Sequence, residues 1–117
     1  MITGVKDEYK NMKSLTVPLG YNTYKVTHIG ARAFEGTALE ELTITKDTNV
    51  RNIMNGAFKG ASRLKALYVL YPDSESIAPP ADFVGVASDF VVYVPEAWLN
   101  CPMYYWGERG LKFVYIN

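Results

Sequence analysis

Histidine and cysteine are nearly missing from this sequence of 117 residues, which has one of each, His28 and Cys101. A single cysteine excludes an intrachain disulfide and any zinc cage built from several cysteines. Because His28 is the only histidine, a catalytic Ser/His/Asp set could be built only around it. Such a set requires several aligned groups, so we do not expect His28 to be catalytic. Cys101 stands in Asn-Cys-Pro-Met without an activating neighbour, which favours a packed thiol over a nucleophile.

Net charge is missing as well, because twelve lysines and arginines balance twelve aspartates and glutamates. Nucleic-acid-binding domains usually carry a basic excess or stripe, so we expect no nucleic-acid partner. No apolar run approaches the ~18 residues of a membrane-spanning helix, so we expect no membrane insertion. The first residues contain neither the basic region nor the apolar stretch of a signal peptide, and no signal peptide is expected in this chain.

Carboxylates are scattered along the chain without a spacing that pairs any two of them. A glycosidase needs two carboxyl groups held a few ångströms apart across a sugar. The glycines form no phosphate-binding loop. We therefore expect no enzymatic activity, no cofactor and no metal site. The carboxylates considered are Glu40, Glu41, Asp47, Asp73, Glu75, Asp82 and Glu96.

What the sequence does contain is a repeat. Residues 26–36 and 50–60 align at a spacing of 24, which brings Ile29 to Ile53 and Phe34 to Phe58. An apolar triplet follows each Ala-Phe-x-Gly, and the second triplet arrives one residue later, as a loop insertion between fixed elements would produce. Self-similarity at a fixed period predicts a stacked repeat architecture. The triplets are Leu39-x-x-Leu42-x-Ile44 and Leu64-x-x-Leu67-x-Val69.

Weaker copies flank the two clear repeats. A degraded copy follows them at spacings of 24 and 25, and an isolated apolar triplet precedes them as half a repeat. In the same alignment His28 corresponds to Asn52, which predicts a polar surface position for the histidine. The degraded copy consists of Ile77, Phe83 and Val92-x-Val94, and the half repeat is Met12-x-x-Leu15-x-Val17.

The repeat predicts short strands stacked around one core. In Leu-x-x-Leu-x-Ile the last two apolar residues alternate, so they point to one side of a strand. Such a strand is unstable alone, and stacking successive coils pairs the strands and joins their apolar sides. We expect an aromatic column, an isoleucine column and small residues where the chain bends: respectively Phe34, Phe58 and Phe83; Ile29, Ile53 and Ile77; and Ala33, Ala57, Gly36 and Gly60.

The connections between the strands are short. The segments at 31–34 and 55–58 are too short for long helices, and each predicts a single helical or 3-10 turn. Residues 73–80 are rich in turn formers, and the prolines Pro79 and Pro80 predict an irregular coil there. The predicted fold is a β-rich α/β solenoid of about three coils.

The combined pattern resembles the BspA-like class of leucine-rich repeats, whose unit reads roughly Ile-Gly-x-x-Ala-Phe-x-Gly-x-x-x-Leu-x-x-Leu-x-Ile-Pro. Residues 26–45 match it well, residues 50–69 match it except for Met54 at a glycine position, and residues 74–95 match it loosely. The resemblance implies a right-handed leucine-rich-repeat coil. It also implies a cell-surface or secreted location, in bacteria or some protists, and a role in adhesion.

After Pro95 the repeat pattern stops. Residues 96–117 contain a short helical segment, an aromatic cluster and a last strand that ends at Ile116. A solenoid needs its last coil covered, because an open end exposes both core and strand edge. These residues are therefore predicted to form a C-terminal aromatic cap. The chain, 1–117, is then a single leucine-rich-repeat domain with its repeats over 12–95.

Two sets of residues are candidates for binding. If the alternating apolar residues face inward, the residues between them form an outward ladder. Exposed tyrosines on such a ladder suit protein interfaces, although they also support packing between strands. The aromatic residues of the cap either stack on sugar rings or cover the last coil. The ladder is Thr16, Thr43, Tyr68 and Tyr93, and the aromatic set is Trp98, Tyr104, Tyr105 and Trp106.

The expected function is therefore non-catalytic recognition. A protein partner, in protein–protein interaction or adhesion, is the first hypothesis, and carbohydrate binding through the cap aromatics is the alternative. The half repeat around Leu15 and Val17 leaves an uncovered strand edge beside apolar side chains. Such an edge pairs readily with another chain, which predicts a weak homodimer through the N-terminal end.

Overall fold

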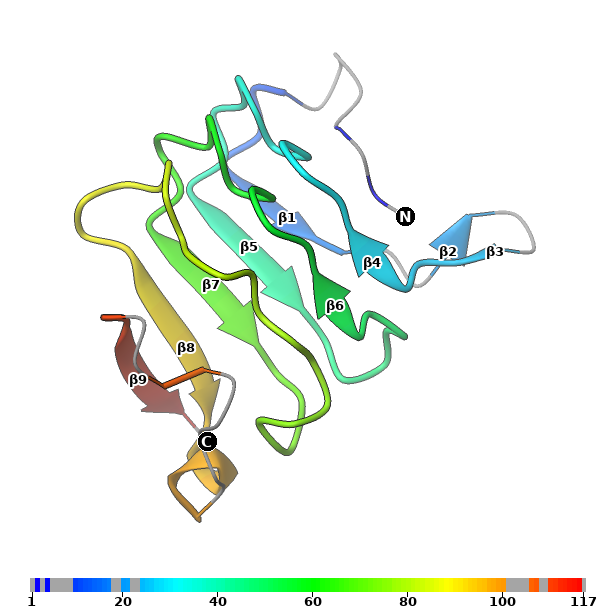
Figure 1. Ribbon diagram of the computed structural model, residues 1–117, viewed down its shortest axis with the longest axis vertical. Helices are drawn as coiled ribbons and strands as arrows, with labels where there is room; N and C mark the ends of the chain where they lie inside the picture. The colour runs from blue at the N-terminus through cyan, green and yellow to red at the C-terminus, as the bar shows by residue number, and fades with distance from the viewer. Residues whose placement is uncertain are drawn as a thin grey trace.

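The computed structural model describes residues 2, 4, 10–17, 20, 21, 24–100, 106, 107 and 110–116 of the chain. Its main element is a five-stranded sheet in which every neighbouring pair runs parallel (Figure 1). The strand order β1-β5-β7-β8-β9 is the order along the chain. The strands are β1 (Ser14–Thr16), β5 (Glu41–Ile44), β7 (Ala66–Val69), β8 (Val91–Pro95) and β9 (Lys112–Ile116).

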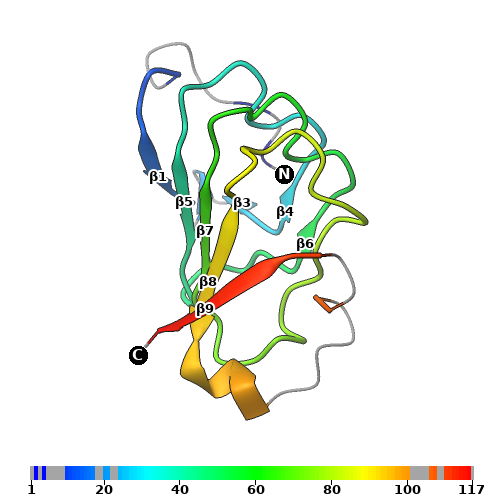
Figure 2. The same ribbon diagram turned by 90° about the vertical axis from the view of Figure 1, so that its left-hand side faces the viewer.

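A narrower run of parallel strands lies opposite the main sheet (Figure 2). β4 (His28–Ile29) pairs with β6 (Asn52–Ile53), and single bridges add Ile2 beside β4 and Ala78 beside β6. The chain alternates between the two sides, as the coils of a solenoid must. There are about 4 such turns rather than the three expected, because β9 adds a coil that the repeat pattern does not show.

Other secondary structure is scarce. β2 (Gly20–Tyr21) and β3 (Tyr24–Lys25) form a two-stranded antiparallel sheet, and η2 (Glu96–Asn100) is the only helix in the described part of the chain. Among those residues no helix has the length and apolar character to cross a membrane. The helical turns expected at 31–34 and 55–58 are not confirmed, because both segments are isolated hydrogen-bonded turns.

The apolar triplets determine the register of the main sheet. Leu15 lies opposite Leu42, Leu42 opposite Leu67, and Leu67 opposite Val92. The half repeat therefore joins the sheet as β1. The predicted alternation is confirmed in β5, where buried and partly exposed residues alternate. A slip by one residue would move every apolar side chain of a strand to the opposite side, so burial of one side fixes the register.

The predicted aromatic column is confirmed. Phe34 and Phe58 are buried and stack with ring centroids 6.2 Å apart, and Phe83 stacks on Phe58 at 5.5 Å. The predicted bends are confirmed at Gly36 and Gly60, whose φ angles of 74° and 79° lie in the left-handed region that glycine adopts without strain. The same spacing thus repeats both the core and the turns.

The third coil is irregular, as its prolines predict, but its register differs from the expected one. The sequence alignment brings Ile77 to Ile53, whereas the backbone pairs Asn52 with Ala78. The Ala78 N–H donates to the Arg51 carbonyl, and the Ala78 carbonyl accepts from the Ile53 N–H, both at 2.8 Å. Proline follows Ala78 and has no N–H, so this ladder ends after one bridge. Ile77 is nevertheless completely buried.

The described residues after Pro95 do more than cover the end of the core. β9 pairs with β8 over its whole length, with Phe113 opposite Val92, so the main sheet continues into the predicted cap. Trp98 and Trp106 are buried and meet edge to face with ring centroids 5.6 Å apart. This segment is therefore a further coil and a cover at once.

Candidate interaction surface

One row of outward residues runs across all five strands of the main sheet. Thr16 lies opposite Thr43, Thr43 opposite Tyr68, and Tyr68 opposite Tyr93. The structure therefore brings all four residues of the predicted ladder together. Tyr93 lies in turn opposite Val114, which is exposed and extends the row to β9.

Val114 is the member of this row that sequence reasoning misses. Its strand pairs with β8 at a separation of 21 residues, which is the distance from Val92 to Phe113, whereas the repeats have spacings near 25. Burial along β9 also lacks strict alternation. The one signal in the sequence is the mostly apolar segment from 111 to 116, interrupted by Lys112, which predicts a strand but neither its neighbour nor its register.

Tyr68 and Tyr93 stack face to face at the centre of the row. Their ring centroids are 4.5 Å apart and their planes differ by 11°. This separation is close to the ~4.8 Å between neighbouring strands, so equal rotamers on adjacent strands produce the stack. Both side chains are partly exposed. Rings that hold each other in place offer contact area at a low cost in conformational entropy, which suits a binding surface.

The Glu41 carboxylate influences the Tyr68 hydroxyl. Partial burial is the largest of three causes that raise the pKa of Tyr68 above its usual value. The negative charge of Glu41 raises this pKa further, and interaction with Tyr93 adds a smaller increase. Each cause disfavours the phenolate. The hydroxyl is therefore neutral at physiological pH and can donate a hydrogen bond to a partner. Glu41 itself accepts a hydrogen bond from Ser14 Oγ at 3.1 Å.

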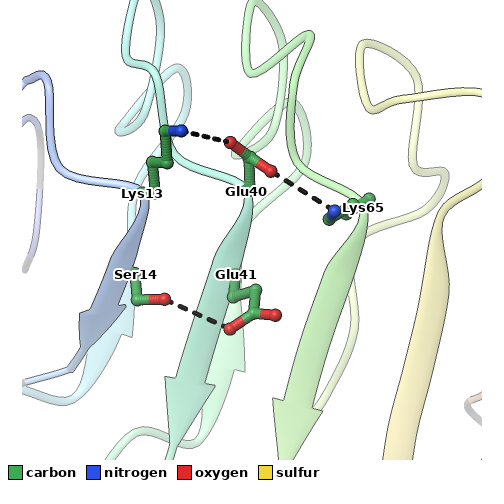
Figure 3. Close-up of polar contacts among 5 residues, drawn as sticks. All are labelled: Lys13, Ser14, Glu40, Glu41 and Lys65. Atoms are coloured by element: carbon green, nitrogen blue, oxygen red, sulfur yellow. Dashed lines mark hydrogen bonds and ion pairs between the residues drawn. The ribbon is translucent and has the colours of Figure 1, made fainter.

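Charged side chains line the ends at which β1, β5 and β7 begin (Figure 3). The Glu40 carboxylate lies between two ammonium groups, at 3.9 Å from Lys13 Nζ and 3.3 Å from Lys65 Nζ. All three side chains contact solvent, so these ion pairs contribute little to stability. They give the outer face a charged border on one side.

The face becomes apolar toward β8 and β9. In the row of Glu41, the residues on β7 and β8 are Ala66 and Val91, which are apolar. The row ends on β9 with one charged side chain, Lys112. No described segment lies over the outer side of β5, β7 and β8 (Figure 2). Solenoids commonly bind partners through a continuous face of this kind.

The aromatic residues considered for sugar binding do not form a surface cluster. The Trp98 and Trp106 indoles are buried, and their N–H groups donate to the carbonyls of Tyr71 at 2.8 Å and Ile77 at 2.9 Å. A ring that stacks on a sugar must present a face to solvent, so neither indole is available for that role. Tyr104 and Tyr105 lie outside the described residues.

Of the two remaining single candidates for chemistry, His28 and Cys101, the structure describes only His28. His28 lies opposite Asn52, as the repeat alignment predicts, and its Nδ1 atom is 2.8 Å from Thr27 Oγ1. Cys101 lies outside the described residues. Among the residues that are described, no three or more His, Cys, Asp or Glu side chains come close enough together to hold a metal ion.

A small polar hollow beside the loop after β5 is explained by coil stacking. The Tyr71 hydroxyl, which contributes to its lining, donates to the Val50 carbonyl at 2.7 Å and lies 2.6 Å from Thr48 Oγ1. These bonds link the loop after β5, which contains Thr48 and Val50, to Tyr71 in the segment that follows β7. The Tyr71 and Thr48 hydroxyls in this hollow are thus already bonded within the fold.

Comparison of the chain with protein-family models, with curated proteins and with solved structures finds no match. The resemblance to leucine-rich repeats therefore depends on the repeated residues and on the parallel solenoid. The geometry offers a continuous face with an aromatic centre and a charged border, which suits contact with another surface.

Proposed function

We propose that this chain is a leucine-rich-repeat module that binds a protein partner through the outer face of its main sheet and catalyses no reaction. The observation that carries the proposal is the row across the five strands with the stacked pair Tyr68–Tyr93 at its centre. Aromatic side chains at the centre of a face and charged groups at its border are the usual composition of protein interfaces.

Adhesion, as part of a larger surface or secreted protein, is the setting we propose for this recognition. The resemblance to the BspA-like class supports it, through two copies of Ala-Phe-x-Gly followed by an apolar triplet. The parallel solenoid supports the family proposal at the level of architecture. Function follows less directly, because one fold serves many partners.

Site-specific photo-crosslinking tests the proposal. Benzoylphenylalanine replaces Tyr93 in one variant, and in the matched control it replaces Asn52, which is exposed on the opposite side of the solenoid. Each variant is irradiated with cell-surface and secreted protein fractions of the producing organism. We expect polypeptide adducts from position 93 in clear excess over position 52. The excess should disappear when unlabelled native chain competes.

A competitor without the aromatic pair completes the experiment. Folded chain carrying Tyr68→Ser and Tyr93→Ser should compete poorly, because it lacks the rings at the centre of the face. Equal yields from the two positions, or competition by the double variant as strong as by native chain, would contradict the proposal.

A further inference from the structure

We propose that the protein bound by the outer face is a second copy of this chain, packed face to face about a two-fold axis parallel to the strands. The inference depends on the proposed function, because it uses the same face. It is supported by the order in which charged and apolar side chains follow one another across the sheet.

One outward row carries opposite charges at equal distances from its middle. From β1 to β9 it reads Ser14, Glu41, Ala66, Val91 and Lys112. Glu41 is on β5 and Lys112 on β9, so the point midway between these charges falls between β7 and β8. Three strand spacings of ~4.8 Å separate them, so they cannot pair within one chain. Lys112 is exposed and Glu41 partly exposed.

A two-fold axis along the strands, placed between β7 and β8, brings these opposite charges together. Rotation about this axis reverses the strand order of the second copy, so β5 faces β9 and β7 faces β8. Glu41 then lies across from Lys112 of the second copy, and symmetry produces the pair twice. A two-fold interface requires a surface that complements itself in this way.

The same rotation matches the neighbouring row. Tyr68 lies across from Tyr93 of the second copy, and Thr43 lies across from Val114. The two rings of each copy are already stacked at 4.5 Å, so four rings meet at the centre with little loss of rotamer freedom. Sheets that pack face to face lie about 10 Å apart with their strands within about 30° of each other, which leaves room for these side chains.

A two-fold axis across the strands does not match the charges. It places every strand opposite its own copy in the reverse direction. An axis through the row of Thr43 and Val114 would bring Glu41 to Thr45 and Lys112 to Ile116. Both charges would then be covered without an opposite charge, which is costly. The order of charges therefore selects the axis along the strands.

The size of the face predicts a weak dimer. Four strands ~4.8 Å apart, with five residues of ~3.3 Å each, have a footprint of roughly 300 Å². Two copies would together cover about twice that footprint, roughly 600 Å², which is below the ~1,200 Å² at which standard interfaces begin and is typical of weak contacts. We expect a dissociation constant in the upper micromolar range, because a contact of this size leaves only a small surplus over the cost of association.

Charge exchange between Glu41 and Lys112 tests the inference with the whole chain. Sedimentation velocity is measured from about 5 μM to about 1 mM, which brackets the expected affinity. Glu41→Lys and Lys112→Glu should each weaken the dimer by about tenfold or more, because each places like charges opposite one another twice. The double variant should return to within about threefold of the native chain, because it restores both pairs.

A matched control separates this pairing from net charge. Glu35→Lys changes the net charge by the same amount at an exposed side chain in the turn that precedes β5, away from the outer face. It should leave the dimer nearly unchanged. Circular dichroism melts establish that each variant is folded.

Two results would overturn the inference. The first is a strict monomer at the highest concentration. The second is a dimer that resists both charge reversals but is lost on Leu15→Lys, which would place the contact at the edge of β1. In either case, photo-crosslinks from position 93 to a different protein would leave the proposed function standing, whereas their absence would remove both proposals.

Discussion

The backbone N–H of Arg32 donates to the carbonyl oxygen of Gly56, 2.8 Å away, and the two residues occupy the same place in successive coils. Both have left-handed backbone, with φ angles of 56° and 76°. Glycine adopts this conformation freely, whereas an L-residue is strained in it by roughly 1–2 kcal/mol. The solenoid therefore imposes on Arg32 a turn that suits the glycine of the next coil.

Arg32→Gly should stabilise the protein. The strain that it removes exceeds the additional chain entropy of an unfolded glycine, so we expect a gain of about 0.5–1 kcal/mol in the free energy of unfolding. Arg32→Gly also removes the exposed ion pair of Arg32 with Glu35. Exposed ion pairs contribute little to stability, so this loss should offset only a small part of the gain. Gly56→Ala, the reverse change, should destabilise by about 1 kcal/mol. Urea unfolding of both variants measures the difference, and a loss of stability in Arg32→Gly contradicts the prediction.

Phe58→Ala should destabilise the protein by about 3–5 kcal/mol, because a large buried ring is replaced by a cavity. Phe58 stacks on Phe34 and on Phe83, so the loss affects three coils at once. Lys59→Ala is the adjacent control, since Lys59 is exposed and should barely change the melting temperature. A cost below about 1 kcal/mol for Phe58→Ala would mean that the column does not hold the coils together.

Gly85→Ala should be more damaging than Gly36→Ala, although both glycines have left-handed backbone with φ angles of 105° and 74°. A Cβ atom at Gly85 would lie 2.7 Å from the Phe58 carbonyl oxygen and 2.8 Å from the Lys59 Cα atom, whereas nothing lies within 4 Å at Gly36. We expect about 1 kcal/mol for Gly36→Ala, from backbone strain alone, and an additional 1–3 kcal/mol or so for Gly85→Ala from the clash. Equal thermal shifts in the two variants would refute the close approach of the coils.

Trp106 should prove structural rather than sugar-binding. Trp106→Ala should cost about 3–5 kcal/mol through the lost ring. Trp106→Phe should cost about 1–3 kcal/mol, because it leaves the buried Ile77 carbonyl without its indole donor. Leu99→Ala, at a side chain of 63% exposure, is the control and should change little. Glycan arrays should show no binding by the native chain, and reproducible binding that a folded Trp106→Phe variant loses would revive the carbohydrate hypothesis.

Glu41→Gln should lower the pKa of the Tyr68 hydroxyl without returning it to the usual value, because partial burial, the larger cause, remains. The pKa of Tyr68 is raised in the folded state. Its contribution to stability is therefore complete below the unfolded value of about 10 and is lost as the pH rises through the folded value. NMR titration of ring-labelled tyrosine follows the hydroxyl directly. Glu35→Gln is the matched control, and an equal effect of the two changes would contradict the assignment.

The sequence alone was sufficient for the parts of this protein that depend on periodicity. Apolar residues that alternate along a strand and recur every 24 or 25 residues specify which side chains are buried, and the stacked rings of Phe34, Phe58 and Phe83 confirm it. The same period places Thr43, Tyr68 and Tyr93 in one row. Burial of one side of a strand is a local property, so the local pattern contains it.

Only the tertiary structure decided what depends on hydrogen-bond partners far apart in the chain. Asn52 pairs with Ala78, not with the residue that the repeat predicts. The prolines that follow Ala78 lack an N–H and limit this contact to one bridge. β9 continues the main sheet by pairing with the edge of β8, and this pairing places Val114 in the outward row beside Tyr93. Indole rings look alike in a sequence whether they face solvent or core. Trp98 and Trp106 are buried because the end of this particular solenoid supplies both the apolar space and the carbonyl acceptors that they require.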